Sequence, residues 1–244
     1  MSRKKELDFF SGVTWSRGIG CYVEQFDADA PVRGESSPSY TDYPTTAGVA
    51  ERVHALVPNA KLIYLVRDPV ERIVSHYLHN RSTGTELRTI EEALRHPADG
   101  TYVTRSKYFM QLEQYLVFFP PSSILVVGQE DMLHDRATTM REVFTFLGVE
   151  SSFYARRFER IMHPTSHRRG SAPLSALVDG LARGMRLPES VSFQVQRVLP
   201  YPFTRRLERP AVNGAVRESL RRELREDAAQ LRELTGKQFP SWCL

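Results

Sequence analysis

The strongest hydrophobic pattern lies between positions 61 and 80, read as K-L-I-Y-L-V-R-D-P-V-E-R-I-V-S-H-Y-L-H-N. Residues 62–66 form a short apolar run rich in branched side chains, which predicts a strand buried on both faces. Asp68 is a suitable N-cap, and Pro69 fits a first helical position because the N–H that proline lacks has no partner there. Apolar residues then recur at the spacing of one helix face, at Val70, Ile73, Val74, Tyr77 and Leu78.

Similar patterns predict further elements along the chain. Residues 123–127 form a second apolar run typical of a buried strand. Thr45 or Thr46 is expected to cap a helix, and Gly148 and Gly236 to end two others. Helical periodicity covers residues 45–56, a short stretch around 90–94, and residues 105–119, 136–147 and 216–234.

The length and composition indicate an ordinary globular protein. At 244 residues the chain can build one α/β domain with a substantial core, so we expect a single domain over residues 1–244. The sequence contains no long apolar run, and its start, M-S-R-K-K-E-L-D-F-F, lacks the apolar core of a signal peptide. We therefore expect no membrane span and a cytoplasmic location, with Cys21 and Cys243 as free thiols.

The charge pattern narrows the kinds of partner. The formal net charge is +4, and the arginines are spread along the chain among acidic residues. Proteins that bind nucleic acid usually concentrate their basic residues in one stripe. The pattern therefore suits a small anionic ligand at least as well as a polymer, and we expect no nucleic-acid partner.

Arg67 and Ser75 are the first candidates for chemistry. Arg67 would lie at the carboxyl end of a central strand, where open α/β sheets bind ligands, and Ser75 about two turns along the following helix. A guanidinium and a hydroxyl so placed can hold a phosphate between them. The alternative is a core strand–helix unit in which Arg67 only caps the turn and pairs with Asp68. The spacing alone favours neither interpretation.

The stretch R-D-P-x-x-R-x-x-S resembles the 3′-phosphate-binding segment of sulfotransferases that use 3′-phosphoadenosine 5′-phosphosulfate (PAPS). The likeness is greatest to bacterial sulfotransferases related to the heparan sulfate N- and 3-O-sulfotransferase domains. This resemblance implies a P-loop-NTPase-like three-layer α/β sandwich with a central, mostly parallel sheet. It also implies that PAPS is the sulfuryl donor and that Arg67 and Ser75 hold its 3′-phosphate.

Glu6 lies just before two aromatic residues, in the stretch K-E-L-D-F-F. By residue type alone it is more typical of a surface carboxylate at the edge of a core. The stretch resembles the K-E-x-x-F-F block of the same sulfotransferases, which implies that Glu6 is the general base and that Lys5 lies near the acceptor. The chemistry requires such a base, because the acceptor hydroxyl or amine loses a proton as it attacks sulfur.

Two further segments resemble acceptor-side blocks of the family. Residues 32–43 resemble a G-E-x-[ST]-P-x-Y block, expected as a short strand leading into a loop near the acceptor. Ser36 stands where the glycan sulfotransferases often have lysine, which makes an acidic glycan a less secure expectation. Arg105 lies at a helix start where the family places residues that face the substrate, although it is equally suited to be an exposed charge.

His79 matches a histidine of the N-sulfotransferase domains that is assigned to stabilising the transfer. It follows Ser75 by four residues and is expected on the same helix face. A lone helical histidine is otherwise structural or solvated, so both interpretations stay open. His76 and His79 have no carboxylate or cysteine at ligand spacing, so we expect no metal.

Residues 163–173, H-P-T-S-H-R-R-G-S-A-P, show no helical or strand period. Glycine-flanked arginines can wrap a phosphate with main-chain N–H groups and guanidinium forks. The stretch resembles the family's basic loop, which closes over the 3′-phosphate and adenine of the cofactor, and this implies binding by His167, Arg168, Arg169 and Gly170. The alternative is a solvated surface loop.

One block of the family has no counterpart in the sequence. The related enzymes begin with a strand, a K-x-G-[TS]-[TS] loop and a helix, which together cradle the 5′-phosphosulfate. Residues 16–20, S-R-G-I-G, lack both the lysine and a preceding strand. We therefore expect a chain that is truncated at its N-terminus relative to the family, without the first strand, loop and helix, or one that turns over PAPS inefficiently.

The resemblance thus favours a PAPS-dependent sulfotransferase acting in line on a hydroxyl or amine of a glycan or small molecule. The alternative is a catalytically silent module that binds only adenosine 3′,5′-bisphosphate. A P-loop kinase would need a Walker-type lysine loop and a carboxylate for magnesium, and neither motif is present.

Overall fold

The structure is a computed structural model that describes residues 1–12, 14–97, 100–159, 169–171 and 204–244. Its strands are β1 (Leu62–Val66), β2 (Ile124–Gly128), β3 (Arg169–Ser171) and β4 (Thr204–Arg206). Its α-helices are α1 (Ile19–Val23), α2 (Val49–Leu56), α3 (Pro69–Thr83), α4 (Ile90–Ala93), α5 (Thr101–Thr104), α6 (Tyr108–Leu116), α7 (Gln129–His134), α8 (Arg136–Leu147) and α11 (Gly214–Thr235). Short 3-10 helices cover Trp15–Arg17, Pro38–Thr41, Pro121–Ser123 and Arg156–Glu159.

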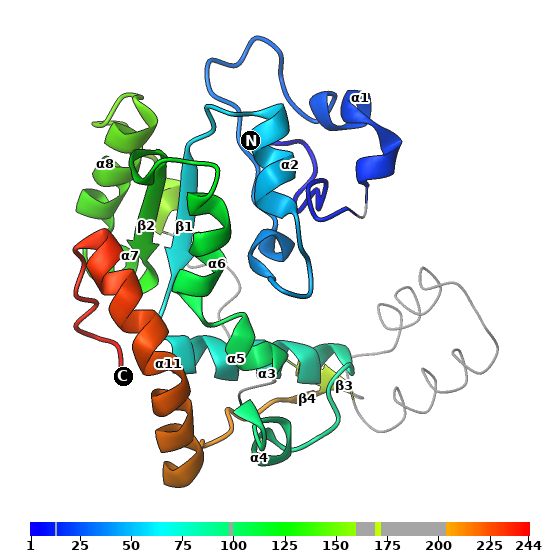
Figure 1. Cartoon of the computed structure of the whole chain (residues 1–244), viewed down its shortest axis with the longest axis vertical. Coiled ribbons are helices and arrows are strands. Elements are labelled where there is room, and N and C mark those ends of the chain that lie inside the picture. The colour runs from blue at the N-terminus through cyan, green and yellow to red at the C-terminus, as the bar shows by residue number, and fades with distance from the viewer. Residues whose placement is uncertain (13, 98–99, 160–168, 172–203) are drawn as a thin grey trace, which may run out of the picture.

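The described strands form two separate pairs (Figure 1). β1 and β2 are parallel, with Leu62 opposite Ile124 and Val66 opposite Gly128. β3 and β4 are antiparallel, with Arg169 opposite Arg206. The chain between β1 and β2 forms α3 to α6, the helical crossover that parallel strands require. The expected α/β class with parallel strands is confirmed, while the three-layer sandwich and its missing first unit stay predictions.

The turn from β1 into α3 forms as its sequence predicts. The Asp68 side chain accepts a hydrogen bond from the main-chain N–H of Glu71 at 2.9 Å, and Pro69 is the first helical residue. Gly84 ends α3 with a φ of 76°, a left-handed conformation that glycine adopts without strain. Because each signal is local, the predicted start of the helix agrees with the structure.

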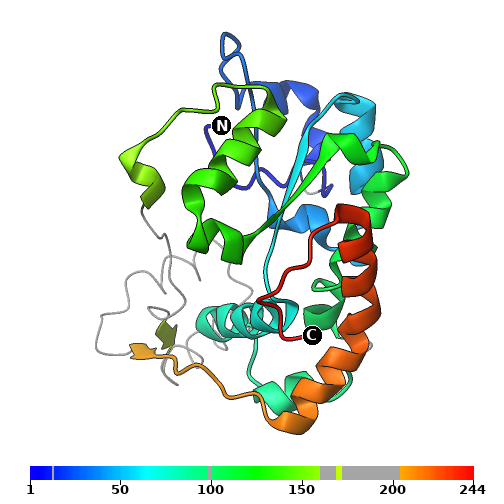
Figure 2. The ribbon, with the colours of Figure 1, turned by 90° about the vertical axis from the view of Figure 1, so that its left-hand side faces the viewer.

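Three apolar clusters form the described core. One joins α3 to α4, α5 and α11; one joins the N-terminal aromatics to α2 and the end of α6; and one joins β1 and β2 to α6, α11 and the C-terminal segment. Figure 2 shows α11 along one side of the molecule, with the C-terminal segment turning back toward the start of α3. Fully buried members include Val70, Ile73, Val103, Leu220, Leu224, Leu231 and Phe119.

β1 was predicted to be buried on both faces, and this is wrong for the described residues. Leu62, Tyr64 and Val66 face the core clusters, whereas Ile63 and Leu65 are 43% and 58% exposed. α8 packs against the neighbouring strand β2, and Lys61, just before β1, donates from its Nζ to the Phe146 carbonyl of α8 at 2.5 Å. The described helices therefore cover one face of β1.

Two other predictions differ from the structure. The short strand expected within residues 32–43 does not form: residues 33–37 have no regular secondary structure, and a 3-10 helix at Pro38–Thr41 follows them. Ser37 and Tyr40 bond the N-terminal segment instead of a sheet. The helix expected from Thr45 begins at Val49 with Gly48 at the N-cap, so neither Thr45 nor Thr46 caps it. Among the described helices, none combines the length and apolar character needed to cross a membrane.

Candidate cofactor and catalytic sites

Arg67 follows directly after β1, and one buried donor of its guanidinium, the Nε N–H, has no partner within the structure. Its main-chain N–H donates to the Tyr108 hydroxyl at 3.4 Å, and its Nη2 lies 3.5 Å from Glu71 Oε2. Its Nε is buried and makes no hydrogen bond within the structure. A buried N–H without an acceptor costs free energy, so this geometry suits a ligand oxygen beside Arg67.

Asp68 fixes the turn that carries Arg67. Its two carboxylate oxygens accept from the main-chain N–H groups of Glu71 at 2.9 Å and Cys243 at 2.6 Å. Its own N–H donates to Glu130 Oε1 at 2.8 Å. The carboxylate is thus occupied by main-chain donors, and the ion pair of Arg67 is formed with Glu71 instead of Asp68. The interpretation in which Arg67 pairs with Asp68 is wrong.

The later part of α3 carries Ser75 and His79. Ser75 is half-buried and His79 is exposed. β3 packs against α3, and Figure 1 shows β3 and β4 beside the later half of this helix. The structure therefore brings the backbone of Arg169 and Gly170 next to the helix that follows Arg67. His167 and Arg168 lie outside the described residues.

Arg209 is a residue of this region that the sequence analysis missed. Its Nη2 forms a close ion pair with Glu71 Oε2, the same oxygen that faces Arg67. The arginine-rich stretch T-R-R-L-E-R at positions 204–209 was a signal in the sequence. Nothing in the spacing placed it near α3, because 138 residues separate Arg209 from Glu71.

Glu6 belongs to a bent N-terminal segment whose Leu7, Phe9 and Phe10 pack in one apolar cluster with residues of α2. Its side chain is 44% exposed and pairs with Lys5, with Nζ and Oε1 3.1 Å apart. Phe9 and Phe10 beside it are buried, so this part of the chain does lie at the edge of a core. Glu6 and Asp8 both have positive φ values, 56° and 50°, which residues with side chains adopt at a cost.

Hydrogen bonds hold this bent segment to residues 32–43, the acceptor-side block that contains Ser36. The Asp8 N–H donates to Ser37 Oγ at 3.0 Å, and Asp8 Oδ1 accepts from Ser39 Oγ at 2.5 Å. Ser36, which is exposed, is next to Ser37, so the structure brings the Lys5–Glu6 stretch and the Ser36 block together.

The structure does not bring Glu6 and Arg67 into contact. Glu6 pairs with Lys5 and Arg67 pairs with Glu71, and among the described residues no hydrogen bond or ion pair joins Glu6 to Arg67. Figure 1 shows the N-terminal segment beside α2, and α3 begins where β1 ends.

Arg105 links the helical crossover to the segment before α2. Its Nε and Nη2 bind the two carboxylate oxygens of buried Asp42, and its Nη1 lies 3.4 Å from His76 Nε2. Nearby, Arg72 donates from Nη1 to Ser106 Oγ at 3.3 Å, and burial lowers the pKa of its guanidinium. Sequence reasoning missed Asp42 and Arg72, because their partners are distant along the chain.

Comparison with known proteins identifies the family of the chain. The sequence model of the family described as the sulfotransferase domain matches residues 16–171, more than half of the chain. The chain belongs to this sulfotransferase family. The resemblance seen in the sequence is confirmed.

Individual relatives share parts of their length with this family member. Over 169 residues it is 30% identical to the human bifunctional heparan sulfate N-deacetylase/N-sulfotransferase 3, covering 59% of this chain and 18% of that protein. Over 207 residues it is 30% identical to the human heparan sulfate glucosamine 3-O-sulfotransferase 6, covering 79% of this chain and 59% of that one. The matched part of the chain thus spans about a fifth of the length of the first of these curated relatives and about three fifths of the length of the second.

A solved structure shares the fold. The crystal structure of a sulfotransferase from Alicyclobacillus acidocaldarius matches with a TM-score of 0.65 at 22% identity, covering 99% of this chain and 87% of that one. The likeness extends over almost the whole chain, so the arrangement of helices around β1 and β2 is that of a known sulfotransferase fold.

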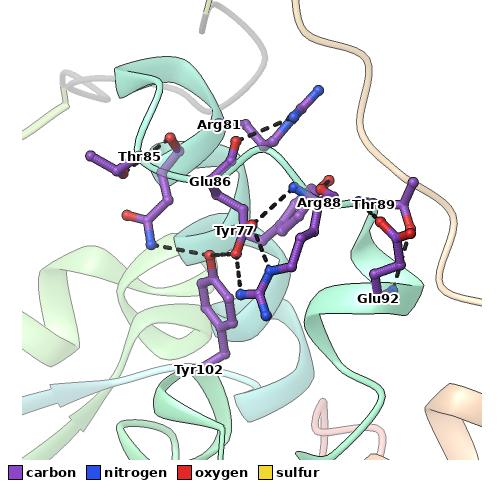
Figure 3. Close-up of polar contacts among 9 residues, drawn as sticks. Tyr77, Arg81, Thr85, Glu86, Arg88, Thr89, Glu92 and Tyr102 are labelled. Carbon is purple, nitrogen blue, oxygen red and sulfur yellow. Dashed lines mark hydrogen bonds and ion pairs between the residues drawn. The ribbon is translucent and has the colours of Figure 1, made fainter. Parts of the chain in front are cut away.

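The loop after α3 is held by a buried carboxylate (Figure 3). Glu86 accepts from the Arg88 guanidinium at 2.7 and 2.9 Å and from the Tyr102 hydroxyl at 3.0 Å. The Arg88 hydrogen bonds lower the pKa of the Glu86 carboxyl to about 2. The network ties the end of α3 to α5, so it positions the helix that carries Ser75 and His79.

No cluster of three or more histidine, cysteine, aspartate or glutamate side chains suited to a metal occurs in the described part of the chain. Cys21 and Cys243 are free and exposed, as expected.

Proposed function

We propose that this family member is a PAPS-dependent sulfotransferase that transfers a sulfuryl group to a hydroxyl or amine of a glycan or small molecule. The observation that carries the proposal is the buried, unpartnered Nε of Arg67 at the carboxyl end of β1. In an α/β sheet this edge is where ligands bind. The chain's membership of the sulfotransferase family identifies the ligand class.

The donor's 3′-phosphate fits the residues after β1. Arg67 offers a free N–H in a guanidinium fork, the geometry that phosphate oxygens accept. Ser75 is half-buried farther along the same helix. The proximity of β3 to α3 supports Arg169 and Gly170 as further contacts, and we extend the proposal to His167 and Arg168 on the family resemblance. PAPS would supply the activated sulfuryl group.

Glu6 is the proposed general base. Its carboxylate is exposed, so an acceptor can reach it, and the neighbouring Lys5 holds one of its oxygens. The acceptor's hydroxyl or amine proton would pass to Glu6 as the nucleophile attacks sulfur. His79, exposed on α3, would stabilise the departing or bridging oxygen. Transfer of this kind depends chiefly on in-line positioning and charge stabilisation.

The acceptor would contact Lys5, Ser36 and Arg105, and the enzyme would act in the cytoplasm. Ser36 is exposed beside the Glu6 segment, which supports its part in this surface. Arg105 is mostly engaged by Asp42, so its contribution to an acceptor would come from its Nη1 side, where His76 lies.

The test is transfer of labelled sulfate from PAPS to a panel of glycans, phenols and amines. Glu6→Gln should lower the turnover at least about a hundredfold, because general-base catalysis typically contributes that much. Glu24→Gln, the same change at an exposed glutamate near α1, is the matched control and should keep the wild-type rate.

Calorimetry with adenosine 3′,5′-bisphosphate tests the cofactor end separately. Arg67→Lys should weaken binding, because lysine cannot replace a guanidinium fork. Binding without any transfer would favour the silent module instead of the enzyme. A rate unaffected by Glu6→Gln would remove Glu6 as the base.

A further inference from the structure

Glu71 joins two arginines that come from distant parts of the chain. Its Oε2 lies 3.5 Å from Arg67 Nη2 and closer still to Arg209 Nη2. Two guanidinium groups therefore converge on one carboxylate oxygen in the first turn of α3. Such a pair of forks around one anionic oxygen is also the arrangement that binds phosphate.

The site has donor capacity that Glu71 does not use. Arg67 Nε is buried and unpartnered, although Nη2 of the same guanidinium reaches the carboxylate. Neither carboxylate oxygen of Glu71 accepts a hydrogen bond from this third donor. A phosphate, with three terminal oxygens and more negative charge, has acceptors enough for both guanidinium groups.

The chain on both sides of Arg209 is held next to α3. β4 ends at Arg206 and pairs with β3, which packs against α3. Leu207 and Val212, on either side of Arg209, pack against the apolar cluster that contains Val70 of α3. The Arg209 side chain itself is 52% exposed, so its contact with Glu71 is not a consequence of its own burial.

We propose that Arg209 is a further guanidinium of the 3′-phosphate site, opposite Arg67, and that Glu71 is a resident counter-ion which the phosphate displaces. The inference rests on the proposed function, because it concerns the same cofactor. In the ligand-free chain, Glu71 keeps Arg67 and Arg209 close together by neutralising their mutual repulsion. When the 3′-phosphate binds, it takes over both guanidinium groups, and the Glu71 carboxylate moves toward solvent.

The experiment is calorimetry on the full chain with adenosine 3′,5′-bisphosphate and, for comparison, adenosine 5′-phosphate. Arg209→Gln should weaken the bisphosphate about tenfold, as the loss of a charged hydrogen bond implies, and leave the monophosphate unchanged. Arg225→Gln, the same change at an exposed arginine of α11, should match the wild type for both ligands.

Glu71→Gln tests whether Glu71 is a counter-ion that competes with the phosphate or a partner that orients the two arginines. Removal of the competing charge should tighten bisphosphate binding several-fold, and in this background Arg209→Gln should cost more than in the wild type. Glu71 and Arg209 are partly exposed, so both variants should keep the wild-type unfolding midpoint, to be checked by circular dichroism.

The outcomes are distinct. If the wild type binds the bisphosphate and Arg209→Gln binds it equally well, the role of Arg209 is overturned and the proposed function stands. Weaker binding by Glu71→Gln would overturn the counter-ion role. No binding by the wild type would overturn the inference together with the cofactor assignment.

Discussion

Arg105 and Asp42, which are 63 residues apart in the sequence, form a bidentate ion pair. The pair joins the chain before α6 to the chain before α2. The Asp42 side chain is only 6% exposed, whereas that of Arg105 is 30% exposed. A buried carboxylate needs its cation, because an unpaired charge in the protein interior is strongly destabilising. The pair therefore gives Arg105 a structural role in addition to the acceptor contact proposed for it.

Arg105→Gln should lower the free energy of unfolding by about 3 kcal/mol, because it leaves the Asp42 carboxylate buried without its cation. Urea unfolding measures the loss. The double change Arg105→Gln with Asp42→Asn should recover part of it, since no charge is then stranded. A variant of unchanged stability with a raised KM for the acceptor would show that Arg105 serves the substrate alone.

Asp68→Ala should destabilise the chain by about 3 kcal/mol, because two main-chain donors, Glu71 N–H and Cys243 N–H, lose their acceptor together. The Cys243 amide should also exchange its hydrogen faster. Asp135→Ala is the matched control, since Asp135 caps α8 through Thr138 N–H alone and is exposed. Equal losses from the two variants would argue against the tie between Asp68 and the C-terminal segment.

The elements that the sequence predicted well are those set by local signals. β1 spans Leu62–Val66 as expected, α3 begins at Pro69 after its Asp68 cap, and α8 spans Arg136–Leu147 before Gly148. In each case the cap, the proline or the glycine lies within a few residues of the boundary it defines. The Arg67 turn could be predicted for the same reason.

Long-range partners could not be predicted, because no local pattern encodes them. Arg209 reaches Glu71 only after β3 and β4 have packed beside α3. No strand forms before Pro38, where one was expected, and Ser37 bonds Asp8 of the N-terminal segment instead. The exposure of Leu65 likewise depends on which face of β1 the helices cover. The sequence of β1 is apolar at every position, so it does not indicate which face is exposed.

Glu86→Gln should destabilise the chain by about 2 kcal/mol at pH 7, because the Tyr102 hydroxyl and the Arg88 guanidinium lose a charged acceptor. The pKa of the Glu86 carboxyl falls from 4.5 to about 2 on folding. A depressed pKa stabilises the folded state above the unfolded value, and this contribution is lost as the pH falls from 4.5 toward 2.

The stability gap between the wild type and Glu86→Gln should therefore be constant near neutral pH and shrink in that acidic range. Thermal or urea unfolding at several pH values measures it. Glu92→Gln, at the exposed cap of α4, is the control and should show a much smaller gap. A gap independent of pH would mean that the charge of Glu86 does not hold the loop after α3.

Ser39→Ala tests whether the bent N-terminal segment positions Glu6. Asp8 keeps a positive φ and accepts from Ser39 Oγ, so loss of this hydroxyl should relax the backbone beside Glu6. We expect a loss of about 1 kcal/mol in unfolding free energy and about a tenfold fall in kcat for sulfate transfer.

The affinity of the Ser39→Ala variant for adenosine 3′,5′-bisphosphate should stay at the wild-type value, because Ser39 bonds Asp8, whereas Arg67 pairs with Glu71. Ser16→Ala, at an exposed serine of the same N-terminal region, is the control and should change neither quantity. Loss of turnover and of bisphosphate affinity in equal measure would show that the change disturbs the whole fold. An unchanged kcat with the expected loss of stability would detach the Asp8–Ser39 contact from catalysis and leave it a structural bond.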